Sequence, residues 1–131
     1  MRYDVITLFP EIIENYCASS ITKRGIDSGV ISVTAHNPRD FSKDKHKKVD
    51  DTAYGGGDGM VLACQPIYDC YNSIEKLENS AFIMLSPQGE KFSQKTAVEL
   101  ASYSQIILLC GHYEGFDERI RLLLKPREIS I

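Results

Sequence analysis

The chain has 131 residues, of which 43% are hydrophobic and 25% charged, and its formal net charge is −3. These values are ordinary for one globular domain, and they exclude a disordered, collagen-like or low-complexity chain. No apolar run approaches the roughly 18 residues of a membrane-spanning helix. The first ten residues lack the features of a signal peptide. The negative charge excludes a chain that binds nucleic acid over its whole surface, but it is compatible with a local basic patch.

The four cysteines are widely spaced, at Cys17, Cys64, Cys70 and Cys110. None forms a C-x-x-C pair, so the sequence predicts neither a zinc site nor a thioredoxin-like redox site, and we expect no metal. We interpret the cysteines as reduced thiols, mostly in the core, of a cytoplasmic protein.

Segments typical of strands and of helices alternate along the chain. β-Prone or apolar runs predict strands at 2–9, 30–36, 81–86 and 105–110 and from 128 onward. Helical periodicity predicts helices at 11–24, from 64 onward, at 93–103 with Ser93 as N-cap, and at 120–124. This alternation predicts an α/β fold with a mainly parallel sheet and flanking helices. Residues 37–59 are predicted to be one long polar loop, which is uncommon unless it is functional or disordered.

Two turns that contain glycine follow predicted strands. Ser86–Gly89 follows the run 81–85, and Gly111–Gly115 follows the run 105–110. Ligands of α/β sheets bind at the carboxyl ends of strands, and glycine allows the backbone to approach a flat ligand closely. The residues alone leave open whether these are ligand loops that meet or two ordinary turns.

The segment 55–59 contains four glycines, Gly55, Gly56, Gly57 and Gly59. It matches neither a dinucleotide-binding fingerprint, because position 60 is Met and no apolar strand precedes it, nor a P-loop. We interpret it as a flexible lid over a substrate, with Asp50 and Asp51 at its base, and a solvated turn is the alternative. The two adjacent carboxylates are a poor catalytic pair, since they point in opposite directions in an extended chain.

A basic stretch precedes this lid. Between positions 39 and 48, five Lys or Arg residues stand against two Asp residues, so the local charge is +3. This pattern predicts a patch that contacts phosphates. A solvated charged surface is the alternative.

Eight motifs in register give the chain a family resemblance. They are Leu8–Glu11, Pro38–Phe41, Asp44–His46, Val49–Asp51, Tyr54–Gly57, Gly59–Met60, Leu85–Gly89 and Cys110–Arg119. With them the whole chain resembles the N-terminal domain of bacterial tRNA (guanine-N(1))-methyltransferases, which belong to the SPOUT superfamily.

The resemblance implies a SPOUT-type parallel sheet with a trefoil knot in its C-terminal part, and a homodimer. It implies S-adenosylmethionine as cofactor, and methylation of N(1) of the guanine 3′ of the anticodon in tRNA. The implied cofactor-binding residues are Ser86, Pro87, Gln88, Gly89, Gly111, Tyr113, Glu114, Gly115 and Ile131. The lid and the basic stretch would contact the tRNA through Arg39, Lys45, His46, Asp50, Tyr54, Gly55, Gly56, Gly57 and Gly59.

The chain departs from the family pattern mainly at its end. The segment from Glu128 to Ile131 reads as a strand cut midway, so we expect a fragment of a longer protein. The third knot loop and the C-terminal tRNA-binding domain would lie beyond it, together with the aspartate proposed as general base. We therefore assign no catalytic residue here and expect the fragment alone to be inactive. His112 stands where arginine is common in the family.

Two other functions remain as alternatives. One is a non-catalytic RNA- or nucleotide-binding module that has kept the fold. The other is a metal-dependent phosphate hydrolase that uses Asp50 or Asp51.

Overall fold

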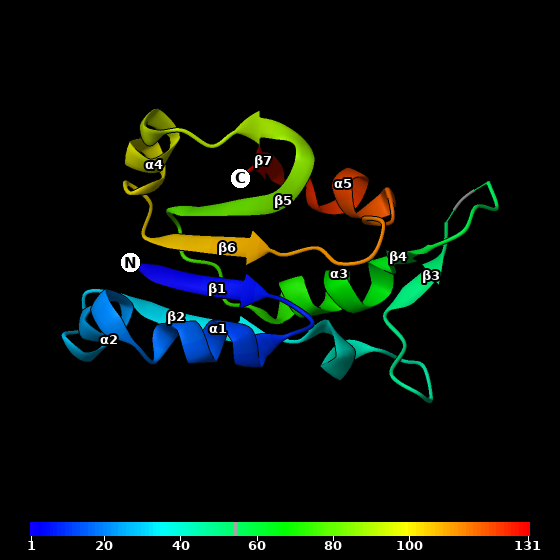
Figure 1. Cartoon of the computed structure of the whole chain (residues 1–131), viewed down its shortest axis with the longest axis horizontal. Coiled ribbons are helices and arrows are strands. Elements are labelled where there is room, and N and C mark those ends of the chain that lie inside the picture. The colour runs from blue at the N-terminus through cyan, green and yellow to red at the C-terminus, as the bar shows by residue number, and fades with distance from the viewer. Residues whose placement is uncertain (54) are drawn as a thin grey trace.

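A five-stranded parallel sheet is the centre of the described chain. The computed structural model describes residues 1–53 and 55–131. The sheet has the order β2-β1-β6-β5-β7 (Figure 1). Its strands are β1 (Arg2–Ile6), β2 (Ser32–His36), β5 (Ser80–Lys91), β6 (Gln105–Leu109) and β7 (Arg127–Ser130). Every neighbouring pair is parallel, which confirms the predicted fold class.

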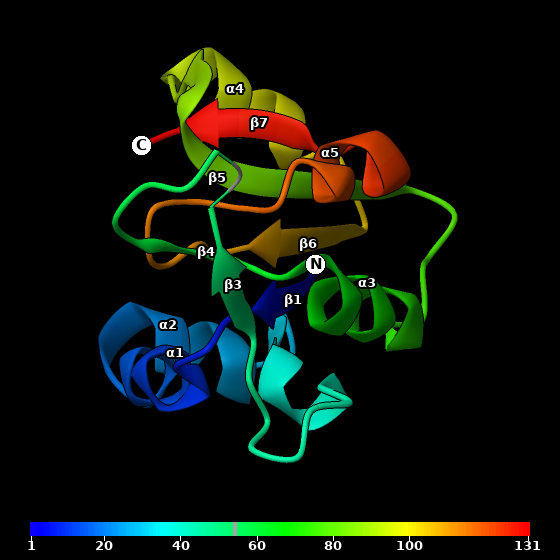
Figure 2. The ribbon, with the colours of Figure 1, turned by 90° about the vertical axis from the view of Figure 1, so that its right-hand side faces the viewer.

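Helices flank the sheet on both sides, as the alternation predicted. They are α1 (Pro10–Cys17), α2 (Ser20–Asp27), α3 (Cys64–Ser73), α4 (Gln94–Leu100) and α5 (Arg119–Leu124), with a short 3-10 helix η1 (Pro38–Phe41). Figure 2 shows α1 and α2 on one side of the sheet and α3 and α5 on the other. None of the described helices has the length and apolarity needed to cross a membrane.

Two apolar cores lie on the sheet. The larger joins strand residues such as Met84 and Ile107 to Ile67 of α3 and Ile120 of α5. The smaller joins Ile83, Ile106 and Ile129 of the strands to Leu100 of α4. The adjacent residues Ile83 and Met84 are both buried, in separate cores, because β5 lies inside the sheet and is covered on both faces.

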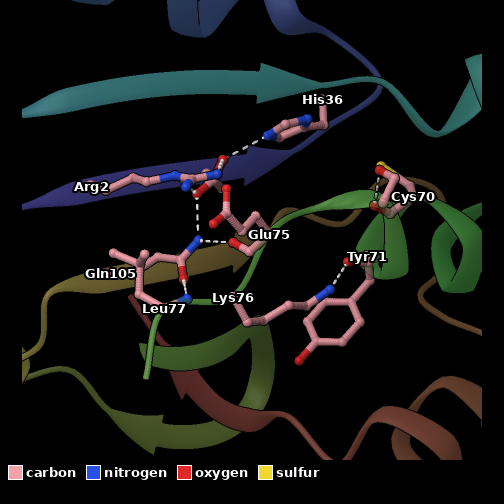
Figure 3. Close-up of polar contacts among 10 residues, drawn as sticks. Arg2, His36, Cys70, Tyr71, Glu75, Lys76, Leu77 and Gln105 are labelled. Atoms are coloured by element: carbon pink, nitrogen blue, oxygen red, sulfur yellow. Dashed lines mark hydrogen bonds and ion pairs between the residues drawn. The ribbon is translucent and has the colours of Figure 1, made fainter. Parts of the chain in front are cut away.

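A buried polar cluster lies at the centre of the sheet, between strands β1 and β6. The Asp4 carboxylate is fully buried and accepts hydrogen bonds from the side chains of Arg2 and Gln105, while His36 Nε2 lies 2.8 Å from its Oδ1 (Figure 3). Burial alone would raise the pKa of Asp4, but the bonds from Gln105, His36 and Arg2 outweigh it and lower the pKa below 3.8.

The N-terminal helical segment differs from its prediction. The sequence predicted one helix over 11–24, but the chain breaks after Cys17 and restarts as α2, with Ser20 at a φ of 55°. Gly25, one residue beyond the predicted helix, lies within α2. The apolar residues that produced the periodicity remain outside the core, since Ile12 is 62% exposed and Tyr16 70%. The apolar periodicity therefore identified helical residues without identifying a buried face.

Two further boundaries were also wrong. Strand β1 ends at Ile6 instead of continuing to residue 9, because the Phe9 N–H donates to Thr7 Oγ1 and turns the chain into α1. The predicted loop 37–59 contains η1 and strand β3 (Asp50–Thr52), which pairs antiparallel with β4 (Met60–Leu62). Pro38 and Val49 are buried and anchor this region. Two isolated buried residues are too few to produce an apolar periodicity in the sequence, so these elements could not be predicted.

Candidate functional site

A pocket of about 430 Å³ lies at the carboxyl ends of β5 and β6. Its walls come from the two glycine-containing segments that the sequence singled out. The lining residues are Leu85, Ser86, Pro87, Gln88, Cys110, Gly111, His112, Tyr113, Glu114, Gly115, Phe116 and Arg121. The residues alone left open whether these segments meet, and the structure shows that both line this pocket.

The first wall is an interruption inside a strand, whereas the sequence predicted a turn after one. β5 continues to Lys91, and Figure 1 shows it bending back on itself. Leu85 pairs with Ile129 of β7, and Glu90 pairs with the same Ile129 again. The four residues from Ser86 to Gly89 therefore leave the ladder between these two pairings. Ser86 is buried and its hydroxyl accepts a bond of 3.2 Å from the Gln88 N–H, which stabilises the bend.

Gly89 has a packing role in this wall. A Cβ at this position would lie 2.5 Å from the backbone nitrogen of Ile129. Only glycine therefore allows the returning part of β5 to approach β7. Gly89 does not line the pocket, unlike Ser86, Pro87 and Gln88.

The second wall is the turn after β6. Gly111 packs against Phe116, whose ring would lie 2.9 Å from an added Cβ. Tyr113 and Gly115 have positive φ values of 58° and 136°. This backbone leaves Tyr113 at the surface, 42% exposed, with its ring 4.8 Å from that of His112. His112 in turn makes an edge contact with Phe9 at 5.0 Å.

The pocket contains charges of both signs. Glu114 brings an exposed carboxylate, and Arg121 brings a guanidinium from α5. Arg121 is held by Glu118 and Glu128 at 2.8 and 2.9 Å, and the bonds to these partners raise its pKa. At the pocket's edge, burial raises the pKa of the Cys110 thiol, which keeps it protonated.

The glycine-rich segment connects β3 and β4, and this hairpin lies beyond the carboxyl ends of the sheet strands (Figure 1). Gly55, Gly56, Gly57 and Gly59 are exposed. Asp50 is half-buried at the base of β3, while the neighbouring Asp51 is exposed. Tyr54 lies outside the described residues.

The basic stretch folds into a turn organised by one carboxylate. Asp44 Oδ2 accepts from the backbone N–H groups of His46 at 2.8 Å and Lys48 at 3.3 Å, and these bonds lower its pKa. Lys45 and His46 lie on this turn and are exposed. Arg39 lies beside it, with its guanidinium donating to the Lys47 carbonyl at 3.4 Å. The predicted cations Lys45 and His46 therefore lie on one exposed turn, and Arg39 of η1 contacts the same turn.

The structure adds four pocket residues from outside the two selected segments, namely Leu85, Cys110, Phe116 and Arg121. It also adds His112, which lies inside the second segment but was not among the implied cofactor-binding residues. Leu85 and Cys110 immediately precede the two selected segments, so their positions in the sequence could have identified them as pocket residues. Arg121 had no such signal, because α5 carries it to the pocket from another element. Ile131 lines a smaller hollow of about 250 Å³ with Leu85, Ser86, Pro87 and Ser130.

The pocket fits a small organic cofactor with a flat ring. Its volume lies in the range of about 300–1,000 Å³ that such sites occupy. Its lining includes Gly111 and Gly115, where a planar ring can approach the backbone closely. Within residues 1–53 and 55–131, no group of three or more His, Cys, Asp or Glu side chains could hold a metal ion.

Comparison with known proteins assigns the chain to a family. A family model described as tRNA (Guanine-1)-methyltransferase TrmD matches residues 1–131. The chain belongs to this family. Two curated relatives, each described as a tRNA (guanine-N(1)-)-methyltransferase, are 50% identical to it over its whole length. They come from Clostridioides difficile and Carboxydothermus hydrogenoformans.

A solved structure of the family agrees with this fold. The crystal structure of tRNA (m1G37) methyltransferase from Aquifex aeolicus matches all of this chain with a TM-score of 0.87 and 38% sequence identity. The chain covers 59% of that structure's chain, and 58% and 51% of the two curated relatives. It thus spans somewhat more than half the length of the proteins it matches.

Proposed function

We propose that this chain is the cofactor-binding part of an enzyme that methylates N(1) of the guanine 3′ of the anticodon in tRNA, with S-adenosylmethionine as methyl donor. The observation that carries the proposal is the pocket at the ends of β5 and β6. It brings together Ser86–Gln88 and Gly111–Gly115, the segments that carry two of the family's motifs.

The residues of the pocket suit this cofactor. Ser86, Pro87 and Gln88 would hold one side of it, and Gly111, Tyr113 and Gly115 the other, mainly through backbone groups. The Glu114 carboxylate supplies negative charge, which complements a ligand that carries a sulfonium and an ammonium group. When bound, S-adenosylmethionine supplies an electrophilic methyl group on sulfur.

The chain's own contribution to the reaction is positioning. Guanine N(1) carries a proton and becomes nucleophilic only after a base removes it. Pocket walls that hold the methyl donor rigidly against N(1) would lower the barrier to transfer. The exposed hairpin tip 55–59 would close over an unstacked base, and the Arg39, Lys45 and His46 turn would contact backbone phosphates.

Three finer features complete the proposal. We place a trefoil knot in the C-terminal part of the fold, where β5 bends back beside β7. We also propose a homodimer, in which each active site is built from both subunits. The enzyme would work in the cytoplasm, where its tRNA substrate is, and the four free thiols are compatible with that compartment.

Calorimetric titration with S-adenosylmethionine tests the proposal, with ATP as the control ligand. The 131-residue chain and the protein at its full natural length are titrated in parallel, followed by a methyl-transfer assay of the full-length protein on tRNA. We expect selective binding of S-adenosylmethionine and transfer to guanine. Binding of RNA without binding of S-adenosylmethionine by the full-length protein would overturn the proposal in favour of a non-catalytic RNA-binding module.

A further inference from the structure

The glycine-rich hairpin and the second pocket wall are bonded to each other along their backbones. The Glu114 N–H donates to the Met60 carbonyl at 3.0 Å, the Leu62 N–H to the Gly115 carbonyl at 2.9 Å, and the Asp117 N–H to the Leu62 carbonyl at 2.9 Å. Leu62 and Phe116 form a parallel bridge. Residues 114–117 therefore lie alongside β4 and pair with its backbone, on the edge of β4 that does not face β3.

The base of this hairpin is anchored in the larger core. Leu62 is buried, and so is Val49, whose carbonyl accepts a bond of 2.7 Å from the Ala63 N–H. The tip differs, because an added Cβ at Gly55, Gly56 or Gly57 would meet nothing within 4 Å. The hairpin thus has a fixed base beside the pocket wall and an open tip.

Gly59 lies where the hairpin meets the wall. Its φ is +109°, and a Cβ on it would lie 2.6 Å from Cγ of Glu114. The wall has its own unusual backbone here, with positive φ at Tyr113 and Gly115 on either side of Glu114. The N–H groups of Glu114 and Asp117 donate to the hairpin's carbonyls, so the hairpin supports the wall in this shape.

We propose that the β3–β4 hairpin, for which the family resemblance implies RNA contact, also forms the outer support of the cofactor pocket, with Gly59 as a positioning residue. The inference rests on the proposed function, because it assumes that S-adenosylmethionine binds between the two walls. A hairpin that touches RNA at its tip and supports the cofactor wall at its base links the two ligands mechanically.

The substitution Gly59→Ala tests the proposal in the protein at its full natural length. We expect the dissociation constant for S-adenosylmethionine, measured by calorimetry, to rise about tenfold, because the added methyl group overpacks the wall. The matched control is Gly29→Ala, which is far from the pocket, has a φ of +76° and has open space around its Cβ. It also places a side chain at a positive φ and should keep the affinity within about twofold.

A second variant separates the contact with Glu114 from general damage. Glu114→Ala removes the Cγ that the new methyl group would meet. The double variant should therefore bind S-adenosylmethionine within about twofold of Glu114→Ala alone, which gives a clear coupling in the double-mutant cycle. Equal affinity of Gly59→Ala and Gly29→Ala, or purely additive effects in the cycle, would overturn the proposal.

Amide hydrogen exchange without ligand keeps the test independent of the proposed function. The N–H groups of Leu62, Glu114 and Asp117 should exchange faster in Gly59→Ala than in Gly29→Ala. Unchanged exchange would overturn the support role. If the unsubstituted protein binds no S-adenosylmethionine, the proposed function fails, and the exchange rates alone then decide whether the hairpin supports the wall.

Discussion

The side-chain amide of Gln105 donates a hydrogen bond of 2.8 Å to the buried carboxylate of Asp4, across 101 positions of sequence. The same Gln105 donates to the Glu75 carbonyl at 2.9 Å and accepts from the Leu77 N–H at 2.8 Å (Figure 3). One side chain thus connects β1, β6 and the segment that follows α3. The Asp4–Gln105 pair stabilises the middle of the sheet. The pocket lies at the carboxyl ends of strands of the same sheet.

Replacing Asp4 by Asn should destabilise the fold. The variant keeps the size of the side chain but loses the charge that accepts from Arg2 and Gln105. We expect a loss of about 2–4 kcal/mol in the free energy of unfolding at pH 7, as for a broken buried charged hydrogen-bond network. Urea unfolding monitored by circular dichroism measures it. Asp58→Asn, on the exposed hairpin tip, is the control and should change stability little.

The buried carboxylate of Asp4 also predicts how the free energy of unfolding depends on pH. Since the folded-state pKa of Asp4 lies below its ordinary value of 3.8, its charge stabilises the fold above about pH 4. This contribution is lost as the pH falls through the folded-state pKa. The difference in unfolding free energy between the unsubstituted protein and Asp4→Asn should therefore shrink below pH 4. A difference that stays constant down to pH 2.5 would contradict the assignment.

Gly89→Ala should disturb the fold where β5 returns to β7. The added Cβ would collide with the backbone of Glu128 and Ile129, which cannot move away as a flexible side chain could. We expect a loss of about 1–3 kcal/mol of stability and weaker binding of S-adenosylmethionine. Gly57→Ala is the matched control, because nothing lies within 4 Å of its Cβ. Equal melting temperatures of the two variants would show that the approach of β5 to β7 is not tight.

Alanine at both Gly56 and Gly57 should impair tRNA turnover more than cofactor affinity. Both glycines lie at the open tip, away from the contact with Glu114, and Gly56 has a φ of +69° that alanine adopts at a cost of about 1–2 kcal/mol. We expect kcat/KM for tRNA to fall about tenfold, with a nearly unchanged dissociation constant for S-adenosylmethionine. Steady-state kinetics and calorimetry measure the two quantities. Equal losses in both would disprove a lid role for the tip.

Cys70 should resist alkylation in the folded protein. Burial raises the pKa of its thiol to about 12, so almost no thiolate is present at pH 8. Cys17 is only partly buried and should react first with iodoacetamide. Mass spectrometry of a time course measures the order of labelling. Modification of Cys70 before Cys17 would show that α3 opens readily.

Part of the fold and of the pocket could be predicted because the signals were local. The continuous apolar runs 81–85 and 105–109 indicated buried parallel strands, and the structure buries both on two faces of the sheet. Ser93 was predicted as an N-cap, and its side chain accepts from the Thr96 N–H at 3.2 Å. Glycine-containing segments directly after such strands indicated a site, since strand ends converge at one edge of a parallel sheet.

Other features depend on partners that are distant in sequence. The periodicity of 11–24 could not reveal the break before α2, because that break reflects how little of this region packs on the sheet. Val49 looked like part of a loop and is fully buried, since its neighbours come from other elements. Arg121 lines the pocket although it comes from α5, outside both predicted ligand segments.

Residue order alone predicted an alternating parallel α/β fold, two candidate ligand segments and a basic stretch before a glycine-rich segment, because strand runs, turn residues and charge are properties of short windows. The tertiary structure determined which contacts the residues of those segments make. It placed Gly89 against Ile129 instead of in the pocket, bonded the base of the β3–β4 hairpin to Glu114 and joined Asp4 to Gln105. These assignments follow from long-range contacts, which bring together side chains and backbone groups that no local pattern relates.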